Sequence, residues 1–241
     1  MALDGLLYVN NKEGLKLKKL LKIKSTALVI AILFVTSIFS LNASAYGYGA
    51  YCQGIDWADG NNRYQWVEKS QNAIAHLRCS QVTMGKYNTG SGALAALKNC
   101  EVFIVHTHGS QTTVNYRESN GNTSNMTTGM INGLPSNALS NLKFAVYGTC
   151  SAGKGGAGAT NIVNSTANKG AKVVIGFKDL TYVPQINQYL HDFLKSLGEK
   201  RNTYQQAMKD GVYWAKFWNW GNAGGTDNPY TRGDLSRTYY G

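Results

Sequence analysis

Three short apolar segments constrain the fold of this chain more than any other feature of its sequence. They are Val102–Val105, Lys143–Tyr147 and Ala171–Phe177, the last centred on Val173–Ile175. Strands that are buried on both faces appear as short apolar runs instead of alternating patterns, and such strands are typical of parallel sheets. The three segments therefore predict the centre of a parallel sheet.

Helical patterns alternate with these strands. Two amphipathic helices close the chain. The first opens at Pro184 with an apolar stripe from Ile186 to Leu197, and the second has Asn202 as its expected cap and an apolar face from Tyr204 to Trp218. Strands alternating with helices predict an α/β domain with a mostly parallel sheet and helices on both sides. Shorter elements are also expected: helices over 62–77, 93–98 and 160–168, a strand over 79–84, and a hairpin joining 113–117 to 126–131.

The first 45 residues have the pattern of a signal peptide. Lysines precede an apolar stretch from Ala27 to Leu41, which ends in Ala43-Ser44-Ala45, a small-x-small cleavage signature. The apolar stretch is short for a membrane span of roughly 20 residues. We therefore expect cleavage after Ala45, secretion to the cell exterior or cell wall, and no membrane span in the mature form. The expected divisions are 1–45 signal peptide, 46–60 irregular lead-in, 61–220 α/β domain and 221–241 polar C-terminal tail.

The net charge of +11 suggests only a limited class of partners. Residues 1–45 hold six lysines and two acids and account for +4, which leaves +7 on the mature chain. No dense Lys/Arg block is present, so nucleic acid is not an expected partner. A moderately basic exported protein suits contact with an anionic cell-wall polymer, although solvated surface lysines explain the charge equally.

Four cysteines stand at 52, 79, 100 and 150. Outside the cell four cysteines allow two disulfides in three pairings. If Cys150 is a nucleophile, one pair and one spare thiol remain, and Cys79–Cys100 is the pairing that we expect. No Cys/His spacing indicates a zinc site, and no metal or other cofactor is expected.

His108 and Cys150 follow two of the three predicted strands. The first strand leads into His106-Thr107-His108-Gly109 and the second into Gly148-Thr149-Cys150. In parallel α/β sheets, chemistry gathers beyond the carboxyl ends of the strands, so both side chains are expected at one edge. A thiol nucleophile needs a base nearby and amide donors for the oxyanion, and a His next to a Gly supplies both.

These segments resemble the two active-site motifs of the caspase-like peptidases, which include caspases, metacaspases, legumain, gingipains, clostripain and separase. Val102–Gly109 resembles their apolar strand followed by His-Gly, and Lys143–Gly153 resembles their apolar strand followed by Cys. Lys169–Gly176 resembles the next strand of the bacterial members. The likeness covers about residues 95 to 215 and rests on the order and spacing of the motifs.

The resemblance implies a three-layer α/β sandwich and a secreted cysteine endopeptidase that acts on a polypeptide substrate. Cys150 would be the nucleophile, His108 the acid or base, and the amides of Gly109 and Cys150 the oxyanion hole. In this family the His does not always contact the Cys closely, so a resting dyad can be open. Clostripain and gingipains cut after basic residues, which makes Asp179, after the third strand, a candidate for substrate binding.

Simpler interpretations stand beside each of these. Cys150 is also explained as an inert buried thiol and His108 as a loop residue. His106 and His108 share a strand face as a metal pair would, but Ser110 and Gln111 stand where metallo-β-lactamase-like hydrolases carry ligands. Gly148–Gly155 nearly matches a P-loop but lacks its final hydroxyl residue.

Two other functions remain open. The first is a caspase-like exported domain that has lost turnover and binds at the cell wall. The second is a carbohydrate-binding domain that uses the C-terminal aromatic residues, for which Trp220 is the test residue. Packing of the last helix in the core accounts for Trp214 and Trp218.

Overall fold

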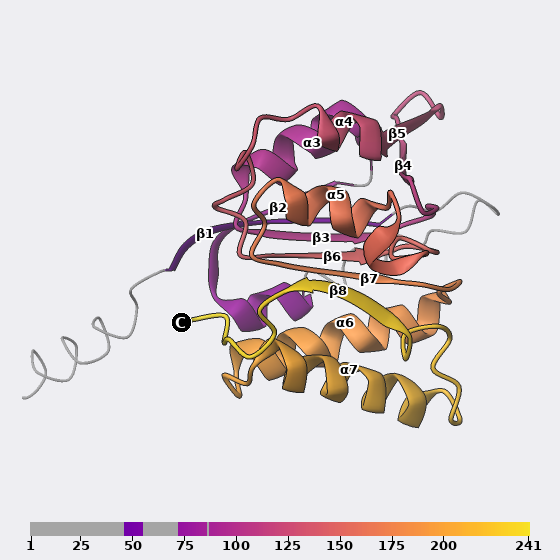
Figure 1. Cartoon of the computed structure of the whole chain (residues 1–241). Coiled ribbons are helices and arrows are strands. Elements are labelled where there is room, and N and C mark those ends of the chain that lie inside the picture. The colour runs from indigo at the N-terminus through magenta and orange to yellow at the C-terminus, as the bar shows by residue number, and fades with distance from the viewer. Residues whose placement is uncertain (1–45, 55–71, 86) are drawn as a thin grey trace, which may run out of the picture. The chain divides into compact units, whose positions relative to one another are not determined.

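Six strands form one sheet in the computed structural model of the protein, in the order β2-β1-β3-β6-β7-β8 (Figure 1). The structure describes residues 46–54, 72–85 and 87–241. Five strands are parallel, and only β8, at one edge, runs antiparallel to its neighbour. The strands are β1 Tyr46–Gly54, β2 Cys79–Gly85, β3 Val102–His106, β6 Phe144–Gly148, β7 Val173–Phe177 and β8 Pro229–Gly233.

The three apolar segments form β3, β6 and β7, side by side, which confirms the predicted sheet centre. Every residue of these three strands is buried. Helices cover both faces of the sheet, so neither face of a central strand meets water. This is the physical reason why the segments read as unbroken apolar runs.

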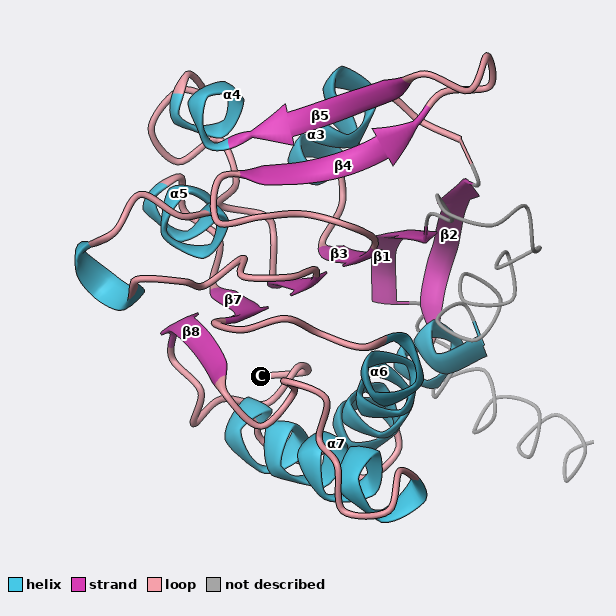
Figure 2. Ribbon diagram, turned by 90° about the vertical axis from the view of Figure 1, so that its right-hand side faces the viewer, coloured by secondary structure: helices cyan, strands magenta, loops and turns pink. Residues whose placement is uncertain are grey.

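Helices form a layer on each side of the sheet (Figures 1 and 2). One layer contains α3 (Gly90–Asn99), α4 (Thr128–Asn132) and α5 (Ile162–Asn168). The other contains α6 (Val183–Gly198) and α7 (Tyr204–Trp218), with the short 3-10 helix η1 (Ala75–Leu77) against α6. The mixed α/β architecture with a mostly parallel sheet between helices agrees with the predicted fold class.

The two faces of the sheet bury separate hydrophobic clusters. Alternate residues of β3 divide between them: Ile104 belongs to the cluster beneath α6 and α7, and Phe103 to the cluster beneath α3, α4 and α5. This division follows from the period of two in a strand. The α6–α7 cluster is rich in aromatic contacts, such as the edge-to-face pair of Phe144 and Phe193 at 5.9 Å.

The lead-in predicted to be irregular is a strand. Residues 46–54 form β1, which lies between β2 and β3 and pairs with both in parallel. Ala50 and Tyr51 are buried, and the Tyr51 ring stacks on Phe103 at 4.9 Å. Glycines at 47, 49 and 54 lower the strand propensity, which concealed β1 in the sequence. Residues 62–71 of the predicted first helix lie outside the described residues.

The predicted C-terminal tail also belongs to the fold. Residues 229–233 form β8, paired with β7, and Tyr239 is buried against Phe144, with ring centroids 5.8 Å apart. An edge strand pairs with a neighbour along one side only, and the residues of β8 are at most partly buried. Its sequence therefore lacks the apolar run that marks a central strand.

Two local expectations are corrected in part. The predicted hairpin exists, but Thr113–Arg117 (β4) pairs with Thr123–Thr127 (β5), and the residues after Thr127 begin α4. Thr203, and not Asn202, caps α7 by accepting from the amide of Gln206. Within the described residues, no helix is both long and apolar enough to cross a membrane.

Candidate active site

The register of β3 and β6 brings His108 and Cys150 to matching positions. His106 pairs with Gly148 at the carboxyl ends of these neighbouring strands, and each candidate residue follows its strand by two positions. Neighbouring strands lie about 4.8 Å apart, so the two segments leave the sheet side by side. His108 is exposed and Cys150 is half-buried. The structure thus places the two residues that the sequence singled out at equivalent positions beyond two neighbouring strands.

A direct contact joins the two segments just beyond the strands. A Cβ atom on Gly109 would lie 3.0 Å from the Cβ of Thr149 and 2.7 Å from the carbonyl oxygen of Thr113. Such separations are shorter than side chains tolerate, so only glycine fits at this position. The absence of a side chain lets the His-Gly segment lie against the residue that precedes the candidate nucleophile.

The start of the β4–β5 hairpin holds the His108 segment. The His108 carbonyl accepts from the Asn115 amide at 3.0 Å, and the Ser110 amide donates to the Thr113 carbonyl at 2.9 Å. The bridge between Gly109 and Val114 lies between these two bonds. Backbone hydrogen bonds to the hairpin therefore fix the position of the segment.

The Cys150 segment is held by the loop after β7. The Ser151 amide donates to the Asp179 carbonyl at 2.9 Å, and the Gly153 amide donates to the Phe177 carbonyl at 2.9 Å. Ser151 has a φ of 59°, in the left-handed region, which turns the chain sharply after the cysteine. The Cys150 thiol lies 3.8 Å from the Thr181 carbonyl oxygen and 4.0 Å from its hydroxyl.

The two amides expected to form an oxyanion hole are those of Gly109 and Cys150. In the part of the chain that the structure describes, neither amide donates a hydrogen bond to another backbone group. Both belong to the adjoining segments that the Gly109–Thr149 contact brings together. Amide donors without a backbone partner are the kind of group that stabilises a tetrahedral oxyanion.

Asp179 lies in the loop after β7, and its backbone holds the Cys150 segment. Its side chain is exposed, and its carboxylate accepts a hydrogen bond from the Asn228 amide at 2.6 Å. Asp179 is therefore close to Cys150 along the backbone, while its carboxylate contacts the loop before β8.

His106 is excluded from acid–base chemistry near neutral pH. Burial lowers its pKa to about 3, although a contact with the Asn187 side chain acts in the opposite direction. The ring is therefore neutral in the folded protein. Among the described residues, no group of three or more His, Cys, Asp or Glu side chains is arranged to hold a metal ion.

The expected Cys79–Cys100 disulfide is wrong, since both residues are free thiols in the structure. Burial raises the pKa of Cys79, and it raises the pKa of Cys100 to about 12. A thiol with such a pKa is protonated and poorly nucleophilic at neutral pH. The side chain of Cys52 lies outside the described residues.

Two asparagines that the sequence did not single out fix the glycine-rich bend after Cys150. The Asn161 amide donates to the carbonyls of Lys154 and Gly156, and the Asn164 amide donates to those of Gly156 and Ala159. A P-loop presents amides to phosphate, whereas this bend turns its carbonyls to side-chain amides. The signal in the sequence was an Asn at the start of a predicted helix, a common N-cap, and Asn161 does cap α5.

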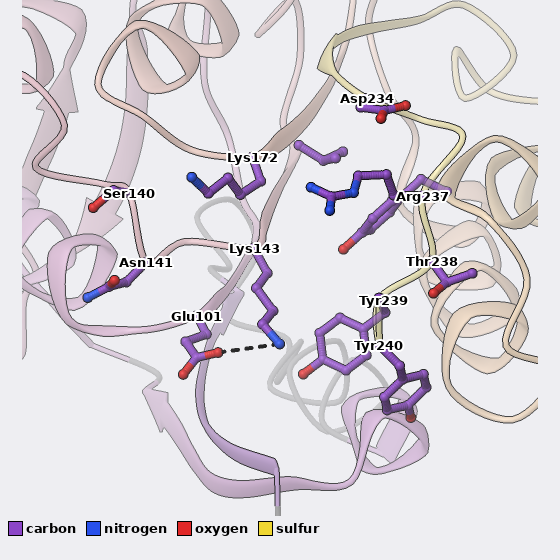
Figure 3. Close-up of a pocket in the computed structure, with 13 residues that line it drawn as sticks. Glu101, Ser140, Asn141, Lys143, Lys172, Asp234, Arg237, Thr238, Tyr239 and Tyr240 are labelled. Atoms are coloured by element: carbon purple, nitrogen blue, oxygen red, sulfur yellow. Dashed lines mark ion pairs between the residues drawn. The ribbon is translucent and has the colours of Figure 1, made fainter.

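Two of the pockets that described residues line stand out, and neither includes His108 or Cys150. One, of about 610 Å³, lies at the amino ends of β3, β6 and β7, the edge opposite the candidate site. Figure 3 shows Glu101 and Lys143 of this pocket turned toward each other, 3.8 Å apart, with Tyr239 alongside. The second, of about 520 Å³, lies between the first half of α6 and the end of α7.

Comparisons with known proteins agree with this arrangement at the level of the fold. No family model matches the sequence, and no curated protein is significantly similar to it. Among solved structures, the Arg-specific cysteine proteinase gingipain R matches 79% of this chain with a TM-score of 0.64 and 15% identity. A complex of the pro- and mature domains of RgpB from Porphyromonas gingivalis matches with a TM-score of 0.64 and 16% identity.

The matched part is about half of each gingipain chain, 47% and 48% respectively. Identity at this level carries the fold and leaves the activity open. The mostly parallel sheet, its two helical layers and these matches together show that the protein has the fold of the caspase-like cysteine peptidases.

Proposed function

We propose that this protein is a cysteine endopeptidase in which Cys150 is the nucleophile and His108 the general acid and base. The observation that carries the proposal is the pairing of His106 with Gly148, which puts both candidates two residues beyond neighbouring strand ends. The exposure of His108 and the partial exposure of Cys150 leave room for a substrate.

The reaction follows from these groups. His108 takes the proton of the Cys150 thiol, and the sulfur attacks the peptide carbonyl carbon. The amides of Gly109 and Cys150 stabilise the oxyanion. The C–N bond then breaks, His108 gives a proton to the leaving amine, and an acyl-enzyme remains on sulfur. Water gives a proton to His108 and adds to the thioester carbonyl. The C–S bond then breaks, which releases the acid, and His108 returns the proton to the Cys150 sulfur.

Substrate preference and location are part of the same proposal. An exposed carboxylate at Asp179, in the loop that holds the Cys150 segment, supports a preference for a basic residue before the cleaved bond. The sequence of residues 1–45 supports export with cleavage after Ala45. Intact-mass measurement of protein collected from the culture medium checks the cleavage, and a mature chain that does not begin at Tyr46 would contradict it.

The deciding experiment compares the alkylation rate of each cysteine by iodoacetamide at neutral pH in the parent and in His108→Ala. Cys79 and Cys100 are internal controls, because burial raises their pKa. We expect Cys150 to react fastest in the parent and at least about tenfold more slowly in the variant, since a nearby imidazole favours the thiolate.

Slow labelling of Cys150 in both proteins, with circular dichroism showing that both are folded, would exclude the dyad. The protein would then be a caspase-like domain without turnover, the first of the two other functions left open by the sequence. If Cys150 is labelled equally fast in the parent and in His108→Ala, the thiol is reactive but His108 has no part in the mechanism.

A further inference from the structure

The pocket between α6 and α7 has an unusual lining. Six of its seven described lining side chains carry no ionisable group, and the seventh is a histidine. Side-chain amides dominate, accompanied by one tryptophan and one proline. The residues are Asn72, Pro184, Asn187, Gln188, His191, Trp218 and Asn219. A charged ligand would find no carboxylate, ammonium or guanidinium group in this lining to pair with.

The amides are held in fixed orientations. The Gln188 amide nitrogen donates to Asp192, and the Asn219 amide nitrogen donates to the Ala215 carbonyl at 2.7 Å. Each bond uses one of the two N–H donors of the amide and sets which way the group faces, so the amide oxygen can accept from a ligand hydroxyl and the second N–H can donate to one. Orientation of the polar groups before binding reduces the entropic cost of ligand recognition.

Trp218 provides the apolar surface of the pocket. The sequence predicted it in the core, yet 62% of the residue is exposed at the C-terminal end of α7. Phe217 and Tyr213, on the same helix, are similarly exposed, and their rings lie 6.3 Å apart and nearly parallel. A group of exposed aromatic side chains with a polar rim is typical of a ligand-binding or interaction surface.

A sugar ring combines the two properties that this lining complements. Its hydroxyls both donate and accept hydrogen bonds, as amides do, and the C–H face of the ring is apolar, as an indole face is. A pocket of about 520 Å³ falls within the range of small-ligand sites. The aromatic residues that continue along α7 extend the surface for a ligand of several units.

We propose that this pocket binds an uncharged oligosaccharide, with a sugar ring on Trp218 and its hydroxyls on the amides of Asn187, Gln188 and Asn219. One lining residue, Asn187, also contacts His106, which lies two residues before His108. Binding requires no turnover, so the proposal is independent of peptidase activity and moves the sugar-contacting residue from Trp220 to Trp218.

Isothermal titration of the full chain carrying Cys150→Ala tests the proposal. The probes are chitohexaose, cellohexaose and maltohexaose, with heparin as a charged comparison. We expect at least one neutral hexamer to bind, Trp218→Ala to weaken that binding about tenfold or more, and Trp218→Tyr to restore most of it. Trp220→Ala is the matched control, because Trp220 is fully exposed and does not line the pocket.

Several outcomes of the same titrations would contradict oligosaccharide binding at this pocket. Binding of none of the neutral hexamers, or of heparin alone, would overturn the proposal, as would equal losses in Trp218→Ala and Trp220→Ala. Displacement of the sugar by unglycosylated peptides of a casein digest would instead assign the pocket to the peptide substrate. Because Cys150 is replaced throughout, failure of the proposed peptidase activity does not affect any of these outcomes.

Discussion

The carboxyl ends and the amino ends of the strands form two opposite edges of the central sheet, and these two edges differ in structure. At the carboxyl edge, His108 and Cys150 follow their strands with partly exposed side chains, and the thiol makes only long contacts, 3.8 and 4.0 Å, to Thr181. At the amino edge, Glu101 pairs with Lys143, and the Lys143 ammonium lies 5.4 Å from the centre of the Tyr239 ring. The carboxyl edge leaves reactive groups accessible, and the amino edge carries contacts that stabilise the fold.

The C-terminal segment accounts for much of this difference. It crosses the amino edge, where Tyr239 packs against Phe144 and the Tyr240 hydroxyl donates to the Gly198 carbonyl at 3.2 Å. In parallel α/β folds, function gathers at the carboxyl ends of the strands. The comparison therefore predicts that substitutions at the carboxyl edge change activity more than stability, and that substitutions at the amino edge do the reverse.

The largest expected effect is loss of the candidate nucleophile. Cys150→Ala should lower kcat/KM on peptide substrates by at least about 10⁴-fold, since the chemical step has no other thiol at this edge among the described residues. Unfolding by urea should be nearly unchanged, because the side chain is only half-buried. Cys79→Ala is the control at the amino edge and should retain activity. Equal activity in Cys150→Ala and the parent would reject the dyad.

Next in size is truncation of the tyrosine that closes the amino edge. Tyr239→Ala should lower the free energy of unfolding by about 3 kcal/mol, because a large buried ring is replaced by a cavity. Chemical denaturation measures this loss, and Tyr239→Phe, which keeps the ring, should retain most of the stability. Activity per folded molecule should be preserved. A fall in activity larger than the fall in the folded fraction would show that the two edges are coupled.

A smaller effect is expected from a single added methyl group. Gly109→Ala forces the amide of residue 109 away from the Thr149 segment, because the new Cβ would lie 2.7 Å from the Thr113 carbonyl oxygen. Loss of one oxyanion donor lowers kcat by about 10²-fold. The matched control is Gly158→Ala, where no atom lies within 4 Å of the added Cβ. Activity losses of the same size in both variants would mean that the close contact at Gly109 has no special role.

The smallest effect concerns the amino-edge ion pair. Burial raises the pKa of Glu101 in spite of Lys143, so the folded state holds the Glu101 proton more tightly than the unfolded state does. Stability linked to this group therefore falls as pH rises through the region just above its ordinary pKa. Glu101→Gln should raise the free energy of unfolding at pH 7 by less than about 0.5 kcal/mol, because the pair is partly solvated. At pH 3 the two proteins should be equally stable. A loss of more than 1 kcal/mol at pH 7 would show that the ion pair is stabilising.

The buried strands and long helices could be predicted because each carries its own signal. Apolar runs gave β3, β6 and β7, and the stripe from Ile186 to Leu197 gave α6. The strands β1 and β8 were missed for two different reasons. Glycine lowers the strand propensity of β1, and β8 is a polar edge strand whose pairing with β7 depends on residues far away in sequence.

By itself, the sequence determined that His108 and Cys150 follow buried strands, because that relation is local and depends on hydrophobic periodicity alone. Only the tertiary structure decided that those strands are neighbours, that Gly109 contacts Thr149, and that Asp179 turns its carboxylate to Asn228. It also decided that the Trp218 side chain is exposed and that Cys79 and Cys100 form no disulfide. These features depend on strand order and on contacts between distant segments, and a pattern of nearby residues carries no record of either.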